Sequence, residues 1–216
     1  MSKEETGKKD GVSRRQRVLY AIQGGLTDEY VKDTLSIDIL DVHRKLRAAL
    51  DNLSKHTHIE EETFNLSDEV VDQFVQETLA AVMELFKAIE TSREKLVSAL
   101  HEKIDNSIID YLISETIGSI DQLSTHHYIK DICTDDVIIV GIDNKHVKFK
   151  ASGTIDCNLQ YGSDSDVRED IGIVFDHSFP FSCELWSSVD NPQDIQTDED
   201  AIGVDTSYWD DRYCDE

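Results

Sequence analysis

A short acidic turn carries the spacing in this chain that is most suggestive of a metal site. Asp164 and Asp166 stand one residue apart within the run Gly162–Asp166. Two carboxylates so spaced can bind one hard cation such as Mg²⁺ or Mn²⁺, and a metal held at a strand end can activate water against a phosphodiester. The same residues also suit a turn in which Asp and Ser side chains accept backbone hydrogen bonds. Both interpretations fit the sequence.

Two histidine-containing runs have the residue types of transition-metal ligands. His56 and His58 flank a threonine and are followed by Glu60 and Glu61, and a second pair stands at His126-His127. Neither run is accompanied by further ligands at a regular spacing. Solvent-exposed polar positions are therefore the favoured interpretation of both.

The cysteines and the missing motifs narrow the chemistry further. The four cysteines are widely spaced and form no C-x-x-C pair, so a zinc site built from them is not expected. Cys157 and Cys183 fall at apolar positions of predicted strands, as buried reduced thiols do. The chain has no phosphate-binding glycine motif, no G-x-S-x-G and no H-E-x-x-H, and its β-region has no strand-borne E-x-K. No cofactor other than Mg²⁺ or Mn²⁺ is indicated.

The element that positions the acidic turn is the strongest structural signal in the sequence. From Lys145 to Tyr161, apolar or small residues occupy every odd position from Val147 and polar residues every even position. Eight such alternations predict a long half-buried β-strand. Gly153, in its middle, is the expected place for a bulge or a bend.

The chain before this strand has helical periodicity. Helices are predicted over about 14–23 and 28–53, then from an N-cap at Ser67 to about residue 89. Thr91-Ser-Arg-Glu94 matches a capping box and predicts the start of a fourth helix, with an apolar face that continues to Ile117. Short connections between these helices favour an antiparallel bundle.

The chain after the long strand predicts further antiparallel strands and then an acidic tail. Apolar runs at 137–142, 171–175 and 179–185 are strand candidates. From Asp190, ten of 27 residues are acidic and Arg212 is the one basic residue, which is typical of a disordered tail. The predicted fold class is therefore α+β. Its parts are a disordered basic arm (1–13), a helical domain (14–128), a small antiparallel β-domain (132–189) and an acidic disordered tail (190–216).

The charge constrains the partners. The formal net charge of −24 repels a phosphate backbone, so direct nucleic-acid binding is disfavoured and a protein partner with a basic surface is favoured. His146, Lys148 and Lys150 form a local basic row on the polar face of the long strand. Three aromatic residues within the acidic tail suggest that it contacts a partner or imitates nucleic acid: Tyr208, Trp209 and Tyr213.

No apolar run is long enough to span a membrane, and the basic N-terminus lacks the apolar core of a secretory signal. A cytoplasmic location is therefore expected. The helical half is also a candidate surface for homo-oligomer formation.

The β-region resembles the predicted PIWI-associating nucleases, a protein family of bacterial defence loci. The resemblance rests on Ala151–Asp166, where an alternating strand leads into Tyr-Gly-Ser-Asp-Ser-Asp, and on the later Phe179-Pro-Phe181. It covers roughly residues 150–185 and, weakly, the helix around residues 43–53. The resemblance implies a role in an antiphage or conflict system and places Asp164 and Asp166 on the family motif as candidate metal ligands.

Two functions follow as alternatives. The first is a non-catalytic accessory module of a prokaryotic antiphage system that acts through protein–protein interaction. The second is a metal-dependent nuclease that uses Asp164 and Asp166. The acidic charge and the missing E-x-K favour the first, whereas the family motif favours the second.

Overall fold

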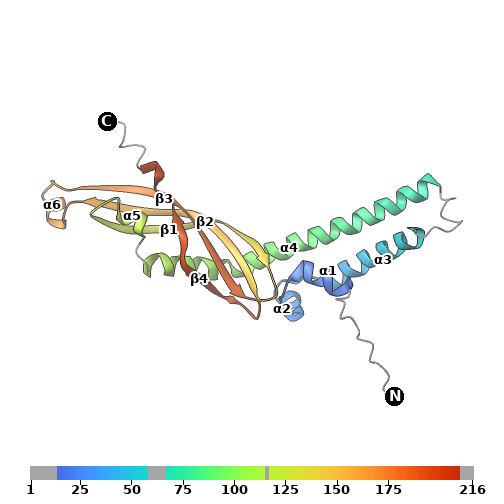
Figure 1. Ribbon diagram of the computed structural model, residues 1–216. Coiled ribbons are helices and arrows are strands. Elements are labelled where there is room, and N and C mark those ends of the chain that lie inside the picture. Colours follow the sequence, from blue (N-terminus) through green and yellow to red (C-terminus); the bar gives the residue numbers. More distant parts are fainter. Residues whose placement is uncertain (1–13, 58–66, 115–116, 210–216) are drawn as a thin grey trace, which may run out of the picture. The chain divides into compact units, whose positions relative to one another are not determined.

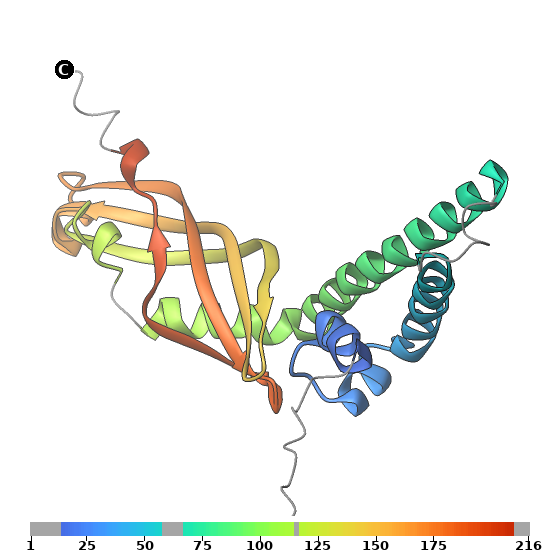
Figure 2. The same cartoon turned by 45° about the vertical axis from the view of Figure 1, so that its right-hand side comes forward.

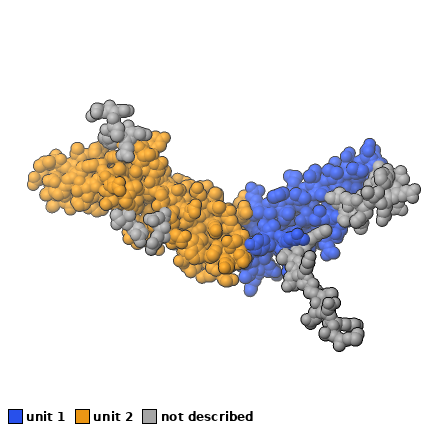
Figure 3. Space-filling model, viewed as in Figure 1, with its two compact units in different colours: residues 1–92 blue, residues 93–216 orange. Residues whose placement is uncertain are grey.

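A computed structural model describes residues 14–57, 67–114 and 117–209 of the chain (Figure 1). The predicted basic arm at residues 1–13 lies outside these ranges. The chain divides into two compact units, residues 1–92 and 93–216, which Figure 3 distinguishes by colour. The predicted fold class is confirmed, because a helical N-terminal region is followed by an antiparallel sheet. No helix in the described ranges is both long and apolar enough to cross a membrane.

Unit 1 is built from α1 (Arg14–Gln23), α2 (Asp28–Asp33), α3 (Ile39–Thr57) and the first part of α4 (Asp68–Ser114). The single helix predicted over 28–53 is wrong, because the chain breaks between α2 and α3. Ser36 has a φ of 51°, a left-handed conformation that interrupts a right-handed helix. The Asp38 side chain then accepts a hydrogen bond from the Asp41 amide at 3.1 Å and caps the start of α3.

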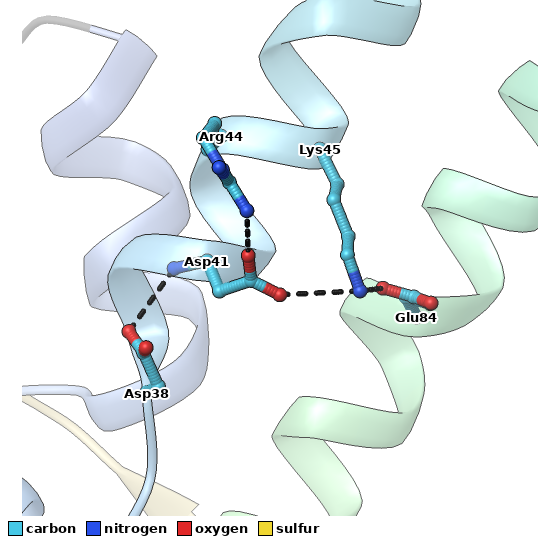
Figure 4. Close-up of polar contacts among 5 residues, drawn as sticks. All are labelled: Asp38, Asp41, Arg44, Lys45 and Glu84. Carbon is cyan, nitrogen blue, oxygen red and sulfur yellow. Dashed lines mark hydrogen bonds and ion pairs between the residues drawn. The ribbon is translucent and has the colours of Figure 1, made fainter.

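Helices α3 and α4 pack against each other within unit 1. Leu46 and Ala49 of α3 pack with Ala81 of α4 in a small buried cluster, with partly buried neighbours that include Leu50 and Leu85. Beside it, Lys45 Nζ lies 3.0 Å from Glu84 Oε2 across the helix pair and 3.1 Å from Asp41 on its own helix (Figure 4). Arg44 also pairs with Asp41. Exposed ion pairs of this kind add little stability, so the apolar cluster is the main contact.

Helix α4 is continuous where the sequence predicts a break. Thr91-Ser-Arg-Glu94 lies in its interior, so the capping box prediction and the separate fourth helix are wrong. Ser92 is fully buried rather than placed at an exposed helix start. The residues on both sides of it have helical apolar spacing, and nothing forces the chain to turn, so the helix continues through a locally favourable cap sequence.

Unit 2 contains the second part of α4, the short helix α5 (Gly118–Asp121) and a four-stranded antiparallel sheet in the order β1-β2-β3-β4. Figures 1 and 2 show the second part of α4 running along one face of this sheet. Five α4 side chains spaced four residues apart are fully buried there: Leu96, Leu100, Ile104, Ile108 and Leu112. The strands are β1 (His126–Ile142), β2 (His146–Tyr161), β3 (Ile173–Ser188) and β4 (Asn191–Val204).

Strand β2 confirms the long strand predicted from alternation. Its odd positions from Val147 to Leu159 are buried, whereas Lys148 and Lys150 are exposed. The register with β3 is unbroken from His146 to Tyr161, so β2 carries no bulge at Gly153 on that side. The irregularity lies instead in β1, between Thr134 and Asp136, opposite Gly153 and its neighbour. Gly153 allows β1 to lie close to β2, because a Cβ at this position would be 2.0 Å from the Cys133 carbonyl oxygen.

The buried thiols are also confirmed. Cys157 and Cys183 lie on the covered face of the sheet, and burial raises the pKa of each thiol to about 11. Both therefore stay protonated at neutral pH and pack as small apolar side chains.

The acidic segment expected as a tail from residue 190 is not a tail over its first part. Asn191–Val204 form β4, which pairs with β3 through partners such as Leu185 with Thr197 and Phe181 with Val204. The backbone groups at the edge of β3 form hydrogen bonds with this segment. A prediction from composition alone does not consider such a neighbour. The sheet thus spans 126–204 rather than 132–189, and the division between the compact units falls inside α4 rather than near residue 128.

Candidate functional site

The acidic turn after β2 forms the first turn of a short helix, α6 (Asp164–Arg168). Gly162 has a φ of 101°, which favours glycine and redirects the chain out of β2. Ser163 is the N-cap, and its hydroxyl accepts a hydrogen bond from the Asp166 amide at 3.2 Å. Asp166 Oδ2 in turn accepts from the Ser163 amide at 2.8 Å and lies 2.7 Å from its hydroxyl. The two reciprocal bonds between side chain and backbone amide form a capping box.

The electrostatics of the two carboxylates agree with this arrangement. Hydrogen bonds from the Ser163 amide and then from its hydroxyl hold the pKa of Asp166 below its usual value. Asp164 Oδ1 accepts a hydrogen bond from Nε2 of the buried Gln160 at 3.0 Å, and the same amide group donates to the Gly162 carbonyl oxygen. Both acids are therefore joined to the end of the β2–β3 hairpin.

A metal at this turn has few ligands to use. Among the described residues, no group of three or more His, Cys, Asp or Glu side chains is placed to hold a metal ion. Asp166 uses Oδ2 in the cap. The arrangement fits a helix cap better than a metal centre, and the assignment of Asp164 and Asp166 as ligands for Mg²⁺ or Mn²⁺ stays a prediction.

The cap makes a testable contribution to stability. We expect Ser163→Ala to lower the free energy of unfolding by about 1 kcal/mol, because the Asp166 amide loses its acceptor. A carboxyl whose pKa is lower in the folded state stabilises the fold above its unfolded pKa, and that stability is lost as the pH falls through the folded value. The wild type should therefore weaken below about pH 4, and Asp166→Asn should weaken less. Urea unfolding followed by circular dichroism at several pH values measures both effects.

The matched control for this pH dependence is Asp110→Asn, which removes an exposed carboxylate on α4. It removes the same charge as Asp166→Asn but no acceptor of the cap, so the acid limbs of the two variants should differ. An Asp166→Asn curve that coincides with the Asp110→Asn curve would contradict the capping role.

The aromatic residues expected to bind a partner have different surroundings. Trp209 packs against the sheet, with its ring centroid 5.0 Å from that of His177 and 6.3 Å from that of Phe179. Tyr208 is largely exposed, and Tyr213 lies outside the described residues. The partner-binding role of the three residues stays a prediction, but Trp209 already has an intramolecular contact surface.

We expect Trp209→Ala to lower the free energy of unfolding by about 2 kcal/mol, because it removes an aromatic side chain that packs on the rings of Phe175, His177 and Phe179. Tyr208→Ala, at the neighbouring exposed position, should change it by less than about 0.5 kcal/mol. Guanidinium unfolding followed by circular dichroism measures the pair. Equal effects at the two positions would mean that Trp209 does not pack against the sheet.

The basic row of β2 lies on the uncovered face of the sheet. His146 meets the indole of Trp186 edge-on, with centroids 5.1 Å apart, and Trp186 Nε1 donates to Asp198 Oδ1 at 3.0 Å. Lys148 and Glu184 line the same shallow pocket. Acidic side chains from β3 and β4 thus accompany the cations, which reduces the local positive charge that the sequence suggests.

One surface was not predicted as a site. Five large apolar side chains of α4 lie outside the contact with α3 and are 43% to 70% exposed. We call this group the α4 apolar face; its members are Val71, Val75, Leu79, Met83 and Phe86. The signal was present in the sequence, because the apolar arc of this helix is wider than a single neighbouring helix can cover. In the antiparallel bundle predicted from the sequence, this arc would face the interior.

Comparison with known proteins places the chain among related sequences. A family model described as a predicted pPIWI-associating nuclease matches residues 89–210, and a second model with the same description matches residues 1–82. The acidic turn and Phe179-Pro-Phe181 lie within the first match. No curated protein and no solved structure gives a match.

Proposed function

We propose a function for this chain, which belongs to the family of predicted pPIWI-associating nucleases. The chain is a non-catalytic accessory module of a prokaryotic conflict system, and it acts by binding a protein partner. The family description names a pPIWI protein as the associate, and this is the partner that we propose. The α4 apolar face is the observation that carries the proposal. Contiguous exposed apolar side chains on a soluble domain mark interaction surfaces.

The charge also supports protein binding over direct action on nucleic acid. A chain with a net charge of −24 repels phosphate unless cations gather locally. The basic row of β2 is accompanied by Glu184 and Asp198, and Asp166 caps a helix. These features favour a partner that supplies the positive charge.

The purified 216-residue chain and a pPIWI protein from the same organism test the proposal. We expect a stable complex in size-exclusion chromatography with light scattering and a saturable isotherm in calorimetry. Two separate peaks at concentrations well above those used for calorimetry would overturn it.

The family description also favours a second candidate, a metal-dependent nuclease with Asp164 and Asp166 as ligands. Incubation with RNA and DNA in Mg²⁺ or Mn²⁺ separates the two functions. Cleavage that is lost in Asp164→Ala/Asp166→Ala would establish the enzyme. Cleavage that persists in the double variant would remove these residues from its site, and no cleavage with complex formation intact is the result expected for the accessory module.

A further inference from the structure

We infer that the α4 apolar face binds an amphipathic helix of the partner protein, and that Lys or Arg residues flank the apolar stripe of that helix. The inference rests on the proposed function, since it specifies the chemistry of the partner at the same surface. It follows from the geometry of α4, from what α3 leaves uncovered, and from the charges beside the exposed side chains.

The exposed side chains form one continuous band. Successive members are four, four, four and three residues apart, which places all five within ~120° of the helix circumference at about 100° per residue. The band is ~22 Å long at about 1.5 Å per residue. Its exposed fractions are 43% at Val71, 49% at Val75, 59% at Leu79, 70% at Met83 and 65% at Phe86.

Helix α3 occupies a different side of α4. Ala81 and Leu85 pack towards Leu46 and Ala49, and Lys45 reaches Glu84 on that same side. The exposed band is therefore separate from the surface of α4 that contacts α3. Two paired helices with one free apolar band accept a third helix, because side chains spaced three and four residues apart interdigitate with an identical spacing.

The charges beside the band select the partner. Residues 68–90 contain six acidic side chains and one basic side chain, Lys87. Glu84 is paired with Lys45, but among the described residues no ion pair is formed by Asp72 or Glu90. Asp72 is seven residues before Leu79 and Glu90 seven residues after Met83, so both carboxylates are nearly in line with the band. A helix whose stripe is flanked by cations complements this pattern.

A second copy of the chain does not complement it. In an antiparallel pairing centred on Leu79, Glu90 would face Asp68 of the other copy. In a parallel pairing, each carboxylate would face its own counterpart. Like charges meet in both arrangements, and each copy brings a net charge of −24. A different protein with the opposite charge is therefore favoured over the homo-oligomer suggested by the helical half.

Two synthetic helical peptides with the same leucine stripe serve as probes, one with lysine and one with glutamate at the flanking positions. We expect the 216-residue chain to bind the lysine peptide at least about tenfold more tightly than the glutamate peptide in fluorescence anisotropy at low salt. Leu79→Asp should weaken that binding by about tenfold or more, because it places a charge in the centre of the band. Ile138→Asp, an exposed apolar position on β1, is the matched control and should leave it unchanged.

A charge-reversed variant tests the same idea with the apolar band intact. Asp72→Lys/Glu90→Lys should bind the lysine peptide several-fold more weakly and the glutamate peptide more tightly than the wild type does. Equal affinity of the wild type for the two peptides would overturn the inference. So would a dimer of the free chain that Leu79→Asp dissociates, or a loss of folding stability in Leu79→Asp, which would mean that this chain itself covers the band.

The pPIWI complex separates this inference from the proposed function. If the complex forms and is unaffected by Leu79→Asp, the function stands and the inference fails. If the complex does not form but the lysine peptide binds selectively, the α4 apolar face takes a basic helix from a different protein and the proposed function fails.

Discussion

Replacing Gly153 by alanine is expected to lower the free energy of unfolding by about 3 kcal/mol or more, and to reduce the yield of soluble protein. A Cβ at this position would lie 2.0 Å from the Cys133 carbonyl oxygen and 2.7 Å from Cε1 of Phe181. The first neighbour is backbone, in the strand paired with β2, so it cannot move aside as the end of a flexible side chain would. Phe181 is itself buried, so its ring has little space to move into. Urea unfolding followed by tryptophan fluorescence measures the loss.

Gly141→Ala is the matched control for this substitution. Gly141 also lies in a strand of the sheet, but a Cβ there would meet nothing within 4 Å. The same added methyl group should change the free energy of unfolding by less than about 1 kcal/mol. Similar losses at the two glycines would mean that a general strand preference, rather than the close approach of β1 to β2, determines the effect.

Gly153 also illustrates how far the sequence predicts the fold. Alternation predicts β2 almost to the residue, because one covered and one solvated face impose a period of two. The same pattern singles out Gly153 as special but does not give the reason. Its role depends on β1, where the bulge occurs and the carbonyl of Cys133 comes close. A neighbour more than ten residues away in the chain is not encoded in local periodicity.

The errors in the prediction have related physical origins. Thr91–Glu94 has the residue types of a capping box, yet α4 continues through it, because apolar contacts on both sides outweigh a local cap preference. Asn191–Val204 has the composition of a solvated tail, yet β3 offers it an unpaired edge. In both places tertiary contacts override a signal that is correct only for an isolated segment.

The candidate site was predicted in part. The acidic turn lies where the sequence places it, at the end of β2, and the turn interpretation accounts for each hydrogen bond of Asp166 described above. The α4 apolar face was missed, since periodicity reports which side of a helix is apolar but not how much of that side its neighbours cover. The exposure of a helical side chain depends on how neighbouring helices pack. On α4, Leu79 is 59% exposed, whereas Ala81 is 7% exposed.

Truncating Ile104 to alanine is expected to lower the free energy of unfolding by about 4 kcal/mol, close to the upper range for a buried isoleucine. Ile104 is fully buried in the middle of the α4 row that covers the sheet. Loss of its side chain leaves a cavity that a helix and a sheet, both rigid elements, cannot readily fill. Denaturant unfolding gives the free energy, and hydrogen exchange with mass spectrometry locates the effect.

The exchange pattern tests whether unit 2 is one cooperative body. Ile113→Ala, on the same helix but 70% exposed, should change stability by less than about 0.5 kcal/mol and leave exchange as in the wild type. With Ile104→Ala, amides of β2 and β3 should lose protection together with those of residues 93–114, because the sheet has its buried face against that helix. Faster exchange confined to α4, with the sheet unaffected, would show that the sheet is stable without the helix. Residues 93–114 and the sheet would then lie close together in unit 2 without unfolding as one cooperative unit.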